Sequence, residues 1–129
     1  MQSRKYTGLS NASLHEDGLT FNITIETDGG AVPLEVPVAE ISKLVHMLSK
    51  VSIASGEIRA LPRHFASEGT LSLRPVDASA MGVMKGEPGR ALVLMLVGAT
   101  TMAYSLDSRK VVAFSEELQG VVGQLGAAG

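Results

Sequence analysis

The stretch LTFNITIETDGGAVPLEVPVAEISKLVHMLSKV, residues 19–51, decides the fold. Over residues 19–27 apolar and polar side chains alternate, which is the pattern of a strand with one solvated face. The glycine-rich residues 28–30 suit a tight hairpin turn, and the alternation then resumes through Val36. Pro33 lies within this second strand and cannot donate to a ladder, so we expect an edge strand there.

An amphipathic helix is expected to follow the hairpin with almost no loop. Pro37 suits its first turn, where a missing N–H has no intrahelical partner. The pattern predicts that the helix ends near Val51 and that Lys43, His46 and Lys50 line its polar face. The expected buried stripe comprises Val38, Ile41, Leu44, Val45, Leu48 and Val51.

Residues 91–122 follow the same pattern as residues 19–51. A shift of 70 positions places Leu48 over Leu118 and Leu44 over Phe114, and the apolar positions coincide without a gap. A hairpin that feeds a helix cannot bury its apolar face alone, so two such units would share one core. The overlay contains no run of identical residues, so an ancient duplication and a mere similarity of form both stay open.

The second unit has a strand and a helix of its own. The strand LVLMLV, residues 92–97, is apolar on both faces, which predicts a central strand covered on both sides. Asp107 or Ser108 is expected to cap the following helix. Its predicted buried stripe comprises Val111, Phe114, Leu118, Val121 and Val122.

The central segment is less regular. It suggests short strands at residues 57–61, 70–74 and 81–84, with a loop at residues 62–65 and a turn at residues 85–89.

These patterns predict an α+β fold, an antiparallel sheet with two helices on one face, built from a possibly duplicated strand-strand-helix unit. The chain of 129 residues has the size of a single domain. Residues 1–13 and 123–129 are expected to be flexible tails.

Composition restricts the class of protein. The chain is 45% hydrophobic with a net charge of −2, as a folded globular protein would be. It has no cysteine, which excludes disulfides and thiolate nucleophiles and suits a reducing compartment. No secretory signal is readable, and the longest uncharged stretch, residues 91–106, is shorter than the ~20 residues that cross a membrane. We expect a cytoplasmic protein that does not enter membranes.

No catalytic, metal or cofactor motif is readable. The three histidines are dispersed, and the sequence lacks HExxH, GxSxG and GxGxxG patterns. We therefore predict no metal and no cofactor and assign no catalytic residue, while the sequence leaves open whether the protein is an enzyme.

The best candidate binding residues are Arg59, Arg63, His64 and Arg74, which gather near Phe65. Arginine pairs with phosphate through two parallel hydrogen bonds, and an aromatic ring can stack on a base. The alternative is an ordinary solvated loop with Phe65 in the core.

Three functional classes follow. We favour a small non-enzymatic accessory or interaction domain that forms a homo-oligomer, most simply a homodimer, because only assembly is positively indicated by the residues. An unknown protein as a further partner stays an open alternative. A small enzyme or ligand-binding protein would instead use a pocket at the subunit interface, with Arg63 and His64 as contacts.

The remaining class is a single-stranded nucleic-acid binder. Several strands followed by a helix, occurring twice, resemble in outline the repeats of Whirly and PUR-type single-strand binders. This resemblance is one of topology and implies a nucleic-acid partner. The net charge of −2 and the aromatic content of 4% make that partner unfavoured, since such proteins use cationic faces and stacking.

Overall fold

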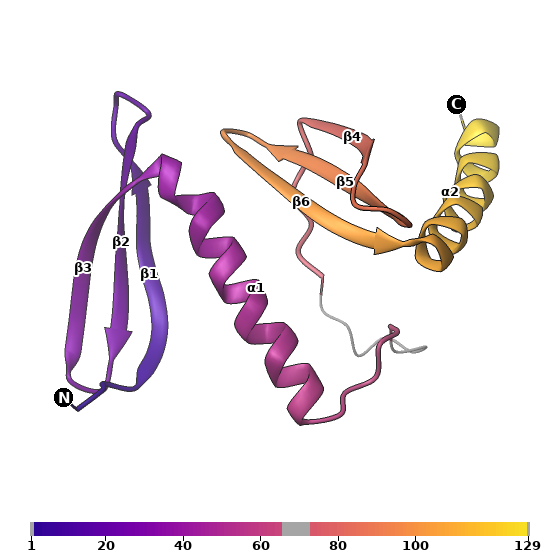
Figure 1. Ribbon diagram of the computed structural model, residues 1–129. Coiled ribbons are helices and arrows are strands. Elements are labelled where there is room, and N and C mark those ends of the chain that lie inside the picture. Colours follow the sequence, from indigo (N-terminus) through magenta and orange to yellow (C-terminus); the bar gives the residue numbers. More distant parts are fainter. Residues whose placement is uncertain (1, 66–72, 129) are drawn as a thin grey trace. The chain divides into compact units, whose positions relative to one another are not determined.

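The computed structural model describes residues 2–65 and 73–128. This part of the chain divides into two compact units, Met1–Leu73 and Arg74–Gly129, and each contains three antiparallel strands followed by an α-helix (Figure 1). The predicted α+β class is confirmed, with the strands in two three-stranded sheets. That the two units form a single domain stays a prediction.

The first unit carries the sheet that we call sheet A. Its elements are β1 (Tyr6–Leu14), β2 (Thr20–Thr27), β3 (Gly30–Pro37), the 3-10 turn η1 (Val38–Glu40) and α1 (Ile41–Ile58). The strand order is β1-β2-β3, so β3 is an edge strand, as Pro33 predicts. In the hairpin between β2 and β3, Gly30 takes up the positive φ of 113°.

Strand β1 corrects the prediction of a tail at residues 1–13 from Tyr6 onward. Its sequence, YTGLSNASL, has few of the residues that favour strands. Pairing with β2 holds it in the sheet, with Leu9 opposite Ile25 and Leu14 opposite Phe21. The register shifts between these two pairs, near Asn11, whose φ is 55°. Pairing with a neighbour therefore outweighs local preference here.

Helix α1 extends beyond the end predicted at Val51. It runs through Ile58, so the strand expected at residues 57–61 is wrong. Its end is closed by two hydrogen bonds, from the Leu61 N–H to the Gly56 carbonyl at 2.9 Å and from the Ala60 N–H to the Glu57 carbonyl at 3.2 Å. With Ala60 at a φ of 53°, this is the usual left-handed helix end, with alanine in the place that glycine favours.

The second unit carries sheet B. Its elements are β4 (Ala80–Lys85), β5 (Arg90–Val97), β6 (Thr100–Asp107) and α2 (Ser108–Ala128), and the strand order is β4-β5-β6. β4 confirms the strand predicted at residues 81–84, and β5 is central as predicted. The strand expected at residues 70–74 falls largely outside the described residues.

The second unit repeats the strand bounds of the first unit and ends in a long helix. The bounds of β5 and β6 equal those of β2 and β3 shifted by 70 residues, although duplication itself stays a prediction. Helix α2 continues through Ala128, which corrects the tail expected at residues 123–129 for residues 123–128. The apolar Val121, Val122 and Leu125 extend the helical pattern past the glycines there.

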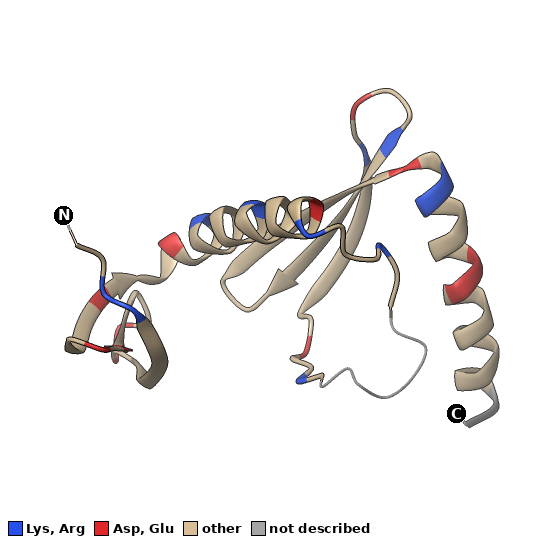
Figure 2. Ribbon diagram, turned by 90° about the horizontal axis from the view of Figure 1, so that it is seen from below, with Lys and Arg blue, Asp and Glu red and all other residues tan. Residues whose placement is uncertain are grey.

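The helices leave most of both sheets uncovered. Within the first unit, α1 runs away from sheet A in both views, and no strand of sheet A packs along its length (Figures 1 and 2). α2 contacts β5 and β6, but Val111 is its only half-buried residue among residues 108–126. Over the described chain the only buried hydrophobic side chain is that of Val93, which is 8% exposed. The helix stripes expected in the core therefore face solvent in the single chain.

Candidate functional site

The most extensive candidate surface is one face of sheet A. Residues directly opposite in an antiparallel ladder share a face, and the register places Phe21 opposite Val36, Ile23 opposite Leu34 and Ile25 opposite Val32. Together with two leucines of β1 they form the sheet A apolar face: Leu9, Leu14, Phe21, Ile23, Ile25, Val32, Leu34 and Val36. None of these side chains is fully buried, and α1 of the same unit does not lie along this face.

The opposite face of sheet A is polar and acidic. It carries Asn22, Thr24, Glu26 and Glu35, and the Ser10 hydroxyl donates to the Glu26 carboxylate at 2.9 Å. Two carboxylates repel a phosphate backbone. This face is therefore suited to water rather than to nucleic acid.

Helix α1 presents a second uncovered surface. Apolar residues recur at spacings of three and four along it, which places them on one side of the helix. We call them the α1 stripe: Leu44, Met47, Leu48, Val51 and Ile58. Their exposed fractions range from 45% at Leu44 to 87% at Ile58. At about 1.5–3 kcal/mol for each side chain fully buried, covering the stripe would stabilise the fold by on the order of 5 kcal/mol.

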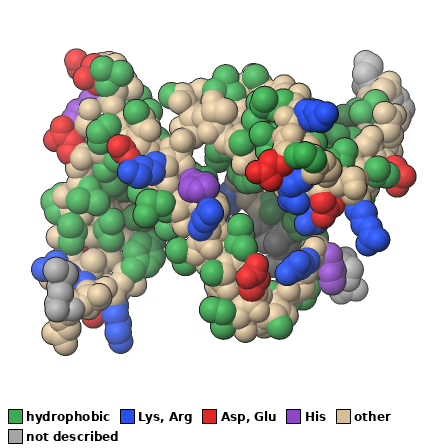
Figure 3. Space-filling view, viewed as in Figure 1, with side chains coloured by type: hydrophobic (Ala, Val, Ile, Leu, Met, Phe, Trp, Pro, Cys, Tyr) green, Lys and Arg blue, Asp and Glu red, His purple; other side chains and the backbone are tan. Residues whose placement is uncertain are grey.

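The second unit repeats this arrangement. Five side chains of α2 are between 38% and 65% exposed and form the α2 stripe: Phe114, Leu118, Val121, Val122 and Leu125. Hydrophobic side chains accordingly reach the surface over each unit (Figure 3). Large exposed apolar patches mark interaction sites.

Methionines gather on one face of sheet B. The register aligns Met81, Met95 and Met102 across the three strands, and Val83, Val93 and Tyr104 align beside them. The Tyr104 hydroxyl donates to the Met102 sulfur at 3.6 Å. Val93 is covered by its neighbours, whereas Val83 is 74% and Met81 58% exposed at the β4 edge. Flexible methionine side chains adapt to irregular surfaces.

The four binding residues predicted from sequence are divided between the two units of the chain. Arg59 caps the C-terminal end of α1, and Arg63 and His64 lie in the exposed segment after Pro62. Phe65 is 84% exposed, so in the described chain it does not fill the core. Arg74 belongs to the second unit, beyond residues 66–72, and is also exposed. An anion-binding role for these four residues stays a prediction.

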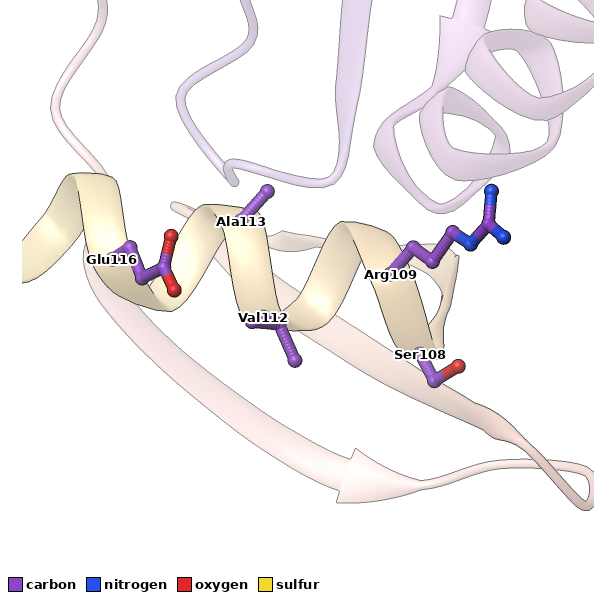
Figure 4. Close-up of a pocket in the computed structure, with 5 residues that line it drawn as sticks. All are labelled: Ser108, Arg109, Val112, Ala113 and Glu116. Carbon is purple, nitrogen blue, oxygen red and sulfur yellow. The ribbon is translucent and has the colours of Figure 1, made fainter.

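A shallow depression of about 370 Å³ lies against α2. It is lined by Ser108, Arg109, Val112, Ala113 and Glu116, all from this one helix, whose side chains leave it in different directions (Figure 4). Small-molecule sites usually enclose most of the ligand surface. A depression lined by one helix cannot do this, and it suits contact with a protein surface better.

The start of α2 carries a local charge arrangement. The Lys110 N–H donates to the Asp107 Oδ1 at 3.0 Å, which confirms Asp107 as the cap of this helix. This hydrogen bond is the main cause that lowers the pKa of Asp107 below its ordinary value of 3.8, and the nearby charges of Lys110 and Arg90 add to it. Arg109 and Lys110 oppose the helix dipole at this end, where Figure 2 shows the basic segment of α2. Asp107 offsets that effect.

We expect Asp107→Ala to lower the thermal midpoint of unfolding at neutral pH, whereas Asp107→Asn, whose side-chain oxygen accepts the same bond, should lower it less. A carboxylate with a lowered folded-state pKa stabilises the fold above 3.8, and this stability is lost as the pH falls through the folded-state value. The difference between wild type and Asp107→Ala should therefore shrink below pH 3.8, as circular dichroism melts at several pH values would show. A constant difference across this range would contradict the assignment.

Within residues 2–65 and 73–128, no group of three His, Asp or Glu side chains is arranged to hold a metal ion. None of the helices in that part of the chain is both long enough and apolar enough to span a membrane. A scan against family models found no match, and searches of curated proteins and of solved structures returned none.

Proposed function

We propose that this protein is a small, non-enzymatic interaction protein that works as a homodimer in the cytoplasm. The observation that carries the proposal is the uncovered apolar surface of each unit, above all the α1 stripe and the sheet A apolar face. A soluble chain that exposes such surfaces gains stability when another surface covers them. A second copy is the simplest partner, because it is present wherever the chain is made.

The chemistry of the polar residues supports an interaction role over catalysis. Active sites usually shift the pKa of several clustered groups, whereas the lowered pKa of Asp107 belongs to a residue that caps a helix. Its main hydrogen bond is to backbone and serves structure. The cytoplasmic location rests on the absence of cysteine, which suits a reducing compartment.

Light scattering during size-exclusion chromatography tests the proposal. We expect one species with about twice the chain mass of 13.5 kDa, stable on dilution through the micromolar range. A species of 13.5 kDa throughout that range would refute the homodimer.

A further inference from the structure

We infer that the dimer is an exchanged one, in which α1 of each chain lays its stripe on the sheet A apolar face of the other chain. This inference rests on the proposed homodimer and adds which two surfaces meet. It makes the contact reciprocal, as a two-fold axis requires, because each chain supplies one helix and receives one.

Helix α1 does not cover its own sheet. The helix leaves sheet A in two perpendicular views (Figures 1 and 2). Its half-buried apolar residues, Ile41 and Val45, lie near its start, whereas the α1 stripe runs on to Ile58 and is exposed. The first unit thus contains one exposed helix stripe and one sheet face that this helix does not cover.

A short connection joins sheet A to α1. The Val38 N–H donates to the Leu19 carbonyl at 2.9 Å, which fixes the chain where it leaves β3. Pro37 has a φ of −63°, which its ring holds, and η1 leads directly into α1. No flexible loop separates the two elements. Folding α1 back onto its own sheet would require a sharp bend within the few residues between Pro37 and Ile41, and short connections of this kind favour exchange between copies.

Helix α1 matches the sheet A apolar face in length and in width. With 18 residues α1 is about 27 Å long, and with 8 residues β2 is about 26 Å long. Three strands spaced about 4.8 Å apart give a face about 10 Å wide, which equals the width of one helix. One helix therefore covers this face along its whole length.

The area of the contact is sufficient for a stable dimer. A side chain of this type carries on the order of 100 Å² of apolar surface. Covering the five exposed residues of the α1 stripe removes about 300 Å² from water, and the sheet face loses a similar area. Two such contacts bury on the order of 1200 Å², the lower end of the range of about 1200–2000 Å² for specific interfaces.

Site-specific cross-linking tests the exchange, since the chain has no cysteine of its own. Leu48→Cys marks the α1 stripe and Leu34→Cys marks the sheet face. The two variants, made with tags of different mass, are mixed, unfolded, refolded together and treated with a short bis-maleimide. A cross-linker replaces a disulfide because packed layers lie about 10 Å apart, beyond the ~7 Å between Cα atoms that a disulfide spans.

We expect the mixed product, one chain of each kind, to form several-fold faster than with Lys50→Cys in place of Leu48→Cys. Lys50 lies on the polar side of the same helix and is the matched control. Leu9→Cys, on the other edge of the same face, replaces Leu34→Cys if that variant fails to fold. Light scattering on each variant before cross-linking shows that it still forms dimers.

The other outcomes separate the two proposals. Dimers in which Leu48→Cys links only to itself would overturn the exchange and leave the homodimer standing. In a chain that carries both cysteines, a link within one chain of a dimer would show that α1 packs on its own sheet and would likewise overturn the exchange. Monomers in all samples would overturn both.

Discussion

Replacing Leu48 by Glu should convert the dimer to monomers. Leu48 is 67% exposed in the single chain and lies at the middle of the α1 stripe. Each interface would lose about 1.5–3 kcal/mol of apolar burial and would also have to accept a charge. Because a two-fold axis counts every substitution twice, the loss is at least about 3 kcal/mol, and the dissociation constant should rise more than about 100-fold. Sedimentation velocity over a range of concentrations measures this change.

Ile53→Glu is the matched control. Ile53 is 62% exposed on the same helix, but it points to the side opposite the α1 stripe. Glutamate is a good helix former, so neither substitution breaks α1 by itself. We expect Ile53→Glu to keep the dimer. If both variants dissociated, or neither did, the α1 stripe would not be the dimer contact.

Leu118→Ala should destabilise the protein by about 2–5 kcal/mol, whereas Lys50→Ala should change the free energy of unfolding by less than about 0.5 kcal/mol. The loss of about 2–5 kcal/mol applies if the Leu118 side chain is buried against another surface. In the single chain Leu118 is 49% exposed, and there its truncation should cost clearly less. The size of the effect therefore reports whether the α2 stripe is covered in solution.

Urea denaturation at two protein concentrations measures the change in the free energy of unfolding for Leu118→Ala and for Lys50→Ala. The denaturation midpoint of the wild type should rise with concentration, as for any dimer, and if the α2 stripe is covered Leu118→Ala should lower it at each concentration. Equal midpoints for Leu118→Ala and Lys50→Ala would mean that the α2 stripe stays in water.

The secondary structure was largely predictable because its patterns are local. Alternation around Phe21 and Ile23 defines β2, and the spacing of Leu44, Leu48 and Val51 defines most of α1. The cap at Asp107 was readable because its hydrogen bond reaches only three residues along the chain. Such signals depend on near neighbours, which the sequence displays directly.

Strand β1 and the end of α1 were not predictable in the same way. β1 depends on pairing with β2, and Leu9 and Leu14 alone were too weak a signal among its polar residues. The end of α1 depends on Ala60 adopting a left-handed conformation that alanine seldom takes. Both features are decided by contacts or strain that a residue pattern does not record.

The candidate site was predictable only in part. The sequence indicated Leu44, Leu48 and Leu118 as apolar positions to be covered, and the structure shows that all three are exposed in a single chain. Periodicity identifies the side of a helix that avoids water, but it does not specify the surface that meets it. That surface depends on tertiary and quaternary contacts.

The two outer strands of sheet A also limit how large an assembly can grow. An exposed edge strand can recruit further strands and extend into a fibre. Pro33 lies opposite Thr24 and leaves the pairing of β2 with β3 intact. The backbone N–H that proline lacks would therefore have pointed outward, where an incoming strand would bind. On the other edge, the irregularity near Asn11 disturbs the row of donors and acceptors along β1. Polymerisation by strand addition is disfavoured at both edges, which leaves closed association through the faces as the safer way to bury apolar surface.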